Sequence, residues 1–199
     1  MRKLTYLSRL LVAGGLVLGG TALAEVPSGE MLSANCAGCH GPEGVSVGPA
    51  SPTIAGLSKD YFLEAMTEYK EGTRPSTVMN RIATGYSETE LERMADHFAD
   101  KEYVPQKQDF NPQAAKSGAK LHDQYCSKCH EDKGLSPKDD SGILAGQWRP
   151  YLQYTMQDYL AGRREMTEDM AERVNEVKDK YGDGGFLALL HFYASQGEQ

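Results

Sequence analysis

The chain has 199 residues, of which 40% are apolar, 25% charged and 9% aromatic. This is an ordinary globular composition, and it excludes a disordered or collagen-like chain. Acidic residues outnumber basic residues by 28 to 21, which gives a formal net charge of -7. Because nucleic-acid binding depends on neutralising phosphates with basic side chains, we expect no nucleic-acid partner.

The first 24 residues have the pattern of a secretory signal peptide. Arg2, Lys3 and Arg9 precede the apolar run Leu10–Leu18, and Ala22–Ala24 follows with small residues typical of a cleavage site. A transmembrane helix would need about 20 apolar residues, and this run is too short. We therefore expect cleavage after residue 24, export to the periplasm and no membrane span afterwards. Cleavage would leave 18 basic against 28 acidic residues, a formal charge of -10.

Each of the four cysteines belongs to a C-x-x-C-H string. The first string holds Cys36, Cys39 and His40; the second, 90 positions later, holds Cys126, Cys129 and His130. Two thiols at this spacing can add to the two vinyl groups of one haem, while the next residue presents an imidazole to the iron. One such string could be a redox dithiol or half a zinc site. Two strings with no spare cysteine in an exported chain favour two covalently bound c-type haems.

The 90-residue offset continues beyond these strings and indicates a duplicated unit. A polar stretch between Val104–Pro105 and Asn111–Pro112 suits a linker. We therefore expect a signal peptide at 1–24, one domain at 25–104, a linker at 105–112 and a second domain at 113–199. The further matching pairs are Gly56 with Gly146, Tyr61 with Tyr151, Met66 with Met156, Tyr69 with Tyr159 and Arg74 with Arg164.

Each half is predicted to be helical, which makes the protein all-α. Ser28 and Asn111–Pro112 are candidate caps of the helices that carry the two attachment strings, and Ser87 with Glu90 forms a capping box for a third helix. Gly72 is a natural helix stop. The helix in the second half that corresponds to the third helix is expected from about residue 185. We also expect His122 on the solvent side of its helix. Trp148 is expected at a haem edge, at the contact between the domains or simply packed in a core.

The sixth iron ligand is expected to be a methionine in each half, since methionine ligation suits electron transfer. Elimination leaves Met79 as the candidate in the first half, in a loop ahead of a short helix. In the second half, simple counting favours Met170. Aligning the helices instead places Met166 in the corresponding loop, and we take Met166 as the prediction with Met170 as its alternative. Met66, Met94 and Met156 are expected to be packing residues.

Four strings resemble the dihaem cytochrome subunit of flavocytochrome c sulfide dehydrogenase, and the likeness extends over the whole mature chain. That resemblance implies two tandem class I cytochrome c domains related by a pseudo-twofold, with His and Met on each iron. It also implies a heterodimer with an FAD-containing subunit that oxidises sulfide. One departure is that Gly142 stands at the position matching Pro52, so the second proximal loop should be organised differently. The strings are Asn35–Gly41, Val47–Pro52, Ile143–Trp148 and Phe192–Gln196.

Three functions compete. The first is an electron-transfer subunit, not an enzyme on its own, that receives electrons from the FAD subunit and passes them to a soluble cytochrome c or similar acceptor. The second is a free-standing dihaem cytochrome that shuttles electrons to a terminal oxidase or another periplasmic redox enzyme. The third is a dihaem peroxidase, which would need an open iron site and is disfavoured by the methionine candidates.

Overall fold

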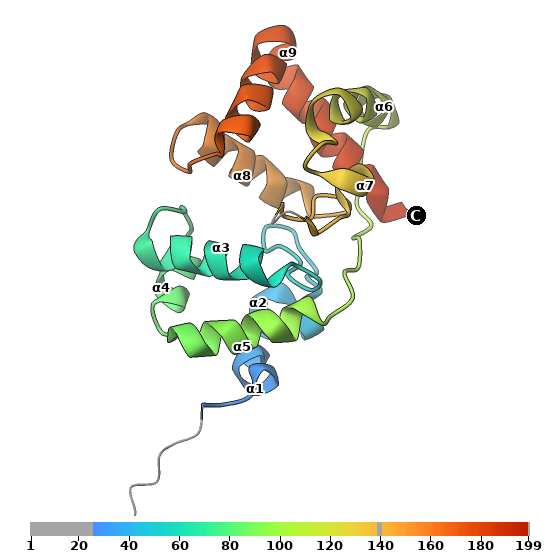
Figure 1. The fold of residues 1–199 in the computed structure, drawn as a ribbon. Helices are drawn as coiled ribbons and strands as arrows, with labels where there is room; N and C mark the ends of the chain where they lie inside the picture. Colours follow the sequence, from blue (N-terminus) through green and yellow to red (C-terminus); the bar gives the residue numbers. More distant parts are fainter. Residues whose placement is uncertain (1–25, 139–140, 199) are drawn as a thin grey trace, which may run out of the picture.

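The computed structural model of the chain describes residues 26–138 and 141–198 (Figure 1). The predicted signal peptide lies outside the described residues. Within the described ranges the chain is helical and contains no β-strand, which confirms the predicted all-α class. No helix in this part of the chain is long and apolar enough to cross a membrane.

The first half of the chain forms a small helical unit around an apolar core that includes Phe62, Leu91 and Phe98. Its longest helices are α3 and α5, and the attachment string lies in the short turns that follow α1. The helices are α1 (Gly29–Ser33), η1 (Ala34–Cys36), α2 (Ala37–His40), η2 (Pro42–Gly44), α3 (Lys59–Glu71), α4 (Met79–Ala83) and α5 (Glu88–Ala99).

The second half repeats this arrangement around its own core, which includes Leu152, Val177 and Phe186. Its last long helix has a break at Gly182, where φ is 57° and ψ is -151°. The helix therefore resumes close to the predicted start near residue 185. The helices are α6 (Pro112–Leu121), the π-turn η3 (His122–Cys126), α7 (Glu131–Gly134), α8 (Arg149–Leu160), α9 (Glu168–Ser195) and η5 (Gln196–Glu198).

The helix boundaries follow the predicted capping signals. The Ser28 side chain accepts a hydrogen bond from the Met31 amide, and the Asn111 side chain accepts one from the Ala114 amide, each satisfying a free N–H of the first helical turn. Ser87 and Glu90 form the reciprocal capping box.

In both halves, the first and last helices cross at a glycine. A Cβ on Gly29 of α1 would collide with the carbonyl oxygen of Arg93 in α5, and a Cβ on Gly118 of α6 would collide with that of Ala188 in α9. Only glycine allows such a close approach of two helix backbones. The repeated crossing shows that the duplication predicted from the sequence is also a duplication of structure.

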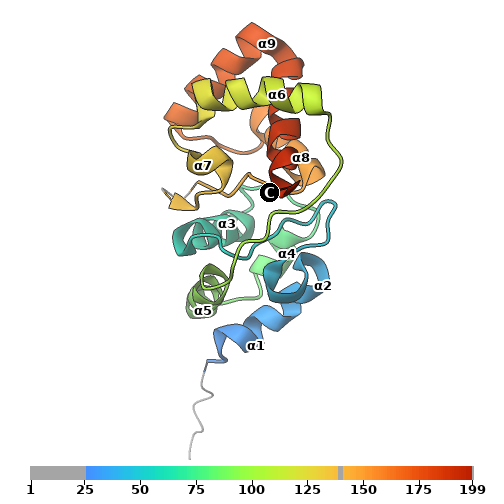
Figure 2. The same cartoon turned by 90° about the vertical axis from the view of Figure 1, so that its right-hand side faces the viewer.

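The two halves stack with α3 facing α8 (Figures 1 and 2). The extended segment after α5 joins them and is held along the second half, because the Gln106 amide donates to the Gly146 carbonyl at 2.8 Å. Trp148 lies between the halves, where its indole N–H donates to the Ser46 carbonyl at 3.1 Å. Of the positions expected for Trp148, the contact between domains is therefore the one observed.

The repeat is not uniform in length. The Gly56 amide donates to the Phe98 carbonyl in the first half, and the Gly146 amide donates to the Tyr193 carbonyl in the second, each at 2.8 Å. The glycines are 90 positions apart, whereas Phe98 and Tyr193 are 95 positions apart. The second half therefore carries five additional residues between these points, the region in which the single helix α9 takes the place of α4 and α5.

Candidate haem sites

The first attachment string presents its imidazole in an oriented form. His40 is 8% exposed, and its Nδ1 donates a hydrogen bond of 2.8 Å to the Pro52 carbonyl. That bond leaves Nε2 free as the ligand nitrogen. Burial lowers the pKa of His40, so the ring is neutral, which is the form that binds iron. Cys36 is half-buried beside it, and Cys39 is exposed.

The second string is built differently. His130 lies outside a regular helix, with φ of -97° and ψ of 67°, and its buried Nδ1 has no hydrogen-bond partner. The backbone of Gly142, the counterpart of Pro52, raises the pKa of this imidazole. It does not form a hydrogen bond with Nδ1. Burial lowers the pKa of His130 to about 4, so this ring is also neutral. The expectation of a different second proximal loop agrees with this arrangement.

Both strings open on one cavity of about 850 Å³. Its walls come largely from α3, α8 and α9, and the lining includes apolar side chains from both cores, such as Phe62 and Leu152. The predicted site residues that line it are Cys36, His40, Met79, Cys126, Cys129, His130 and Met166, together with the alternative Met170. Residues of both halves therefore line this cavity.

The methionine candidates differ in their backbone setting. Met79 is the first residue of α4 rather than a loop residue, and Ala83, four positions later, is fully buried. Met166 lies in the loop ahead of α9. Met170 lies in the first turn of α9 and is followed four positions later by the buried Val174. The preference for Met166 assumes that the ligand lies in a loop, but Met79 is the first residue of a helix. Met166 and Met170 therefore both stay candidates in the second half.

Met66 and Met94 are buried in the first core, as expected for packing residues, although both also line the cavity. His122 contradicts its prediction. It is 1% exposed rather than solvent-facing, and its Nδ1 lies 3.1 Å from the Tyr193 hydroxyl. His122 lies on the same helical face as the buried Ala115 and Gly118 of α6, seven and four positions earlier, and this periodicity accounts for its burial. The π-turn His122–Cys126 comes after that face.

These residues fit covalently bound haem. The four cysteines are free, His40 is buried, His130 is half-buried, and the adjoining cavity is mostly apolar. A thioether-linked porphyrin needs these three features together, with a soft sulfur or imidazole for the sixth position. The fold and the paired sites thus define a two-domain c-type haem protein.

Comparison with known proteins agrees with this class. The cytochrome c family profile matches residues 28–102. The chain is 40% identical over 97 residues to the cytochrome subunit of sulfide dehydrogenase from Chlorobaculum tepidum, covering 45% of this chain and 87% of that protein. It is 30% identical over 170 residues to cytochrome c4 of Pseudomonas aeruginosa, covering 79% of this chain and 84% of that protein.

The crystal structure of reduced cytochrome c4 from Pseudomonas stutzeri matches with a TM-score of 0.69 and 26% identity. The match covers 83% of this chain and 95% of that structure. The chain belongs to the cytochrome c family, with two tandem class I domains and two covalently bound haem c groups. It is an electron-transfer protein related to cytochrome c4 and to the sulfide dehydrogenase cytochrome subunit.

Proposed function

We propose that this chain is the periplasmic electron-transfer subunit of a sulfide dehydrogenase. It would form a heterodimer with an FAD-containing subunit and pass electrons to a soluble cytochrome c or similar acceptor. The observation that carries this proposal is the 40% identity over 97 residues to a cytochrome subunit of sulfide dehydrogenase. The cavity lined by His40 and His130 suits two redox centres within one chain. Each bound haem would supply one-electron chemistry, and a flavin partner would accept the electron pair from sulfide.

In this proposal Cys36, Cys39, Cys126 and Cys129 attach the haems. His40 and His130 are the proximal ligands, Met79 is the distal ligand in the first domain, and Met166 or Met170 is the distal ligand in the second. Filled iron positions leave no place for sulfide to bind, so the chain alone is not the enzyme. The likeness to the Chlorobaculum tepidum sulfide dehydrogenase subunit supports the choice of partner.

A second candidate is a free-standing shuttle between periplasmic redox proteins. The observation that favours it is coverage: the similarity to cytochrome c4 extends over 79% of the chain, whereas the similarity to the sulfide dehydrogenase subunit extends over 45%. A shuttle with a strongly acidic surface would bind basic partners weakly and lose them as salt screens the charges. A permanent subunit would stay bound through a larger interface with an apolar centre.

Size-exclusion chromatography of the native protein at low and high salt separates these candidates. We expect co-elution with a flavoprotein at both ionic strengths, detected by flavin fluorescence of the denatured eluate. Elution alone and without flavin at both salt concentrations would replace the subunit proposal with the shuttle.

A further inference from the structure

A buried histidine lies where the first and last helices of the second half cross. His122 directly follows α6 and is 1% exposed, and its Nδ1 lies 3.1 Å from the hydroxyl of Tyr193 in α9. The two rings meet edge to face, with their centroids 5.6 Å apart. The close helix crossing at Gly118, one turn earlier, holds the two side chains together. A hydrogen-bonded polar pair is therefore enclosed beside the apolar core of this half.

The Tyr193 hydroxyl also reaches the second attachment string. Burial raises the pKa of the Cys126 thiol to about 11, and a hydrogen bond with the Tyr193 hydroxyl opposes that rise. Burial and the same contact with Cys126 raise the pKa of Tyr193 well above its ordinary value. A hydroxyl has one hydrogen, so a hydroxyl that donates to the sulfur must accept from Nδ1 of His122. The three side chains then form a chain in which His122 donates to Tyr193 and Tyr193 donates to Cys126.

The first half has apolar residues in the corresponding places. Leu32 stands 90 positions before His122, and Phe98 is the equivalent of Tyr193, because their carbonyls accept equivalent hydrogen bonds from glycine amides. Leu32 and Phe98 are both buried in the first core, and neither side chain can form a hydrogen bond. The helix crossing therefore does not need polar groups, and a hydrogen-bonded pair adds little net stability over an apolar one. The polar pair consequently points to a role that is specific to the second haem.

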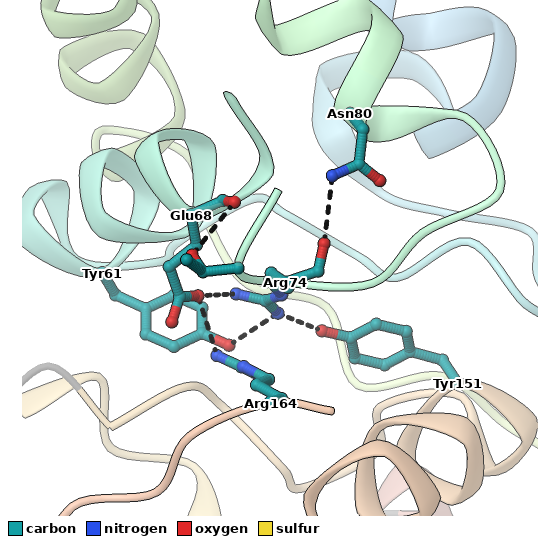
Figure 3. A network of polar contacts seen from close by, with 7 residues as sticks. Tyr61, Glu68, Arg74, Asn80, Tyr151 and Arg164 are labelled. Atoms are coloured by element: carbon teal, nitrogen blue, oxygen red, sulfur yellow. Dashed lines mark hydrogen bonds and ion pairs between the residues drawn. The ribbon is translucent and has the colours of Figure 1, made fainter. Parts of the chain in front are cut away.

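This pair is separate from the polar network between the domains (Figure 3). In that network Arg74 and Arg164 both contact the carboxylate of Glu68 at 3.3 Å, so the network joins the two halves of the chain. His122 and Tyr193 instead belong to one half, and Tyr193 lines the haem cavity beside the second attachment string. A change at this pair should therefore affect one haem and leave the other unchanged.

We propose that Tyr193, positioned by His122, raises the reduction potential of the second haem by donating a hydrogen bond to the sulfur of Cys126. Once the thiol has become a thioether, this sulfur carries no hydrogen and can only accept. The positive end of the O–H dipole then draws electron density from the sulfur, which favours the ferrous state. His122 is a positioning residue, because it acts by fixing and polarising the hydroxyl. The proposal rests on the covalently bound second haem and not on the identity of the redox partner.

The test uses the full holo-protein with two variants and a matched control. Tyr193→Phe removes the hydroxyl, and His122→Leu removes the positioning residue; each introduces the residue type that the first half carries. The control is Tyr103→Phe, which removes a part-buried hydroxyl that donates to the Ala145 carbonyl at 2.9 Å. Tyr103 lies outside the set of described residues that line the haem cavity. The readouts are potentiometric titration of the two haems and the resonance Raman band of thioether C–S stretching. Neither readout involves a flavoprotein or sulfide, so failure here is distinguishable from failure of the proposed function.

We expect Tyr193→Phe to lower the potential of one haem only. The equilibrium constant for its reduction should fall by up to about tenfold, which corresponds to one whole hydrogen bond. The C–S band should shift as well, and His122→Leu should change both readouts in the same direction by no larger amount. Tyr103→Phe should leave both readouts unchanged.

Unchanged potentials and an unchanged C–S band in Tyr193→Phe would overturn the proposal. Equal changes in the potentials of both haems would overturn it too, since the hydroxyl approaches one attachment string. If Tyr193→Phe does not accumulate with two haems, His122→Leu decides by the same two readouts.

Discussion

The side-chain amide of Gln147 in the second domain makes two hydrogen bonds of 2.9 Å with the backbone of Thr53 in the first: its oxygen accepts from the Thr53 N–H and its Nε2 donates to the Thr53 carbonyl. Both residues are buried, at 2% and 0% exposure. Thr53 follows Pro52, whose carbonyl orients His40. One domain therefore holds the loop that fixes the proximal imidazole of the other.

Replacing Gln147 by Leu should destabilise the protein by about 1–3 kcal/mol, because the buried N–H and C=O of Thr53 lose their partners. Denaturant unfolding monitored by haem absorbance measures this change. The control is Gln153→Leu on the exposed face of α8, which should change the free energy of unfolding by less than about 0.5 kcal/mol. Equal effects of the two substitutions would show that Gln147 does not join the domains.

Replacing Met79 by Ala should remove one haem's share of the sulfur-to-iron charge-transfer band of the ferric protein and lower that haem's potential, because the thioether stabilises the ferrous state. Optical spectroscopy with potentiometric titration measures both. Met31→Ala is the control, since Met31 is 67% exposed on α1. An unchanged band in Met79→Ala would remove Met79 from the ligand set.

The second-domain ligand is decided by Met166→Ala and Met170→Ala in parallel. Only the variant that lacks the ligand should lose the remaining share of the charge-transfer band. Loss in Met170→Ala alone would show that simple offset counting is right and the helix alignment wrong.

Both irons should be six-coordinate in the native protein, so carbon monoxide should bind poorly to its ferrous form. Substantial binding would favour the peroxidase hypothesis.

Tyr193→Phe should cost about 1–3 kcal/mol, because it leaves the buried Nδ1 of His122 without its partner. Thermal unfolding measures the effect, and Tyr154→Phe is the control, since Tyr154 is 57% exposed. A cost no larger than that of the control would mean that the hydroxyl contributes nothing at this site.

Burial also lowers the pKa of His122 below its ordinary value. The unfolded chain therefore binds the proton more readily, and stability should fall as the pH drops below about 6.5. His122→Phe should reduce this slope in unfolding experiments between about pH 7 and pH 5. An identical slope in the variant would assign the pH dependence to other groups.

The sequence predicts this fold well wherever the signal is local. The attachment strings, the caps at Ser28, Ser87 and Asn111, and the stop at Gly72 depend on a few neighbouring residues, and the structure contains each of them.

What the sequence could not show depends on contacts between distant residues or on irregular backbone. The π-turn at His122 has no periodic signature. The five additional residues of the second half are visible only once Phe98 and Tyr193 are seen to make equivalent hydrogen bonds. The shared carboxylate of Glu68 requires the two domains to be stacked, since its partners Arg74 and Arg164 come from different halves of the chain.

Anaerobic stopped-flow mixing with sulfide tests the central claim most directly, with haem absorbance followed in the presence and absence of the co-purified flavoprotein. We expect that both haems are reduced rapidly when the flavoprotein is present, and that the chain alone reacts far more slowly. Equal rates of haem reduction with and without the flavoprotein would contradict it.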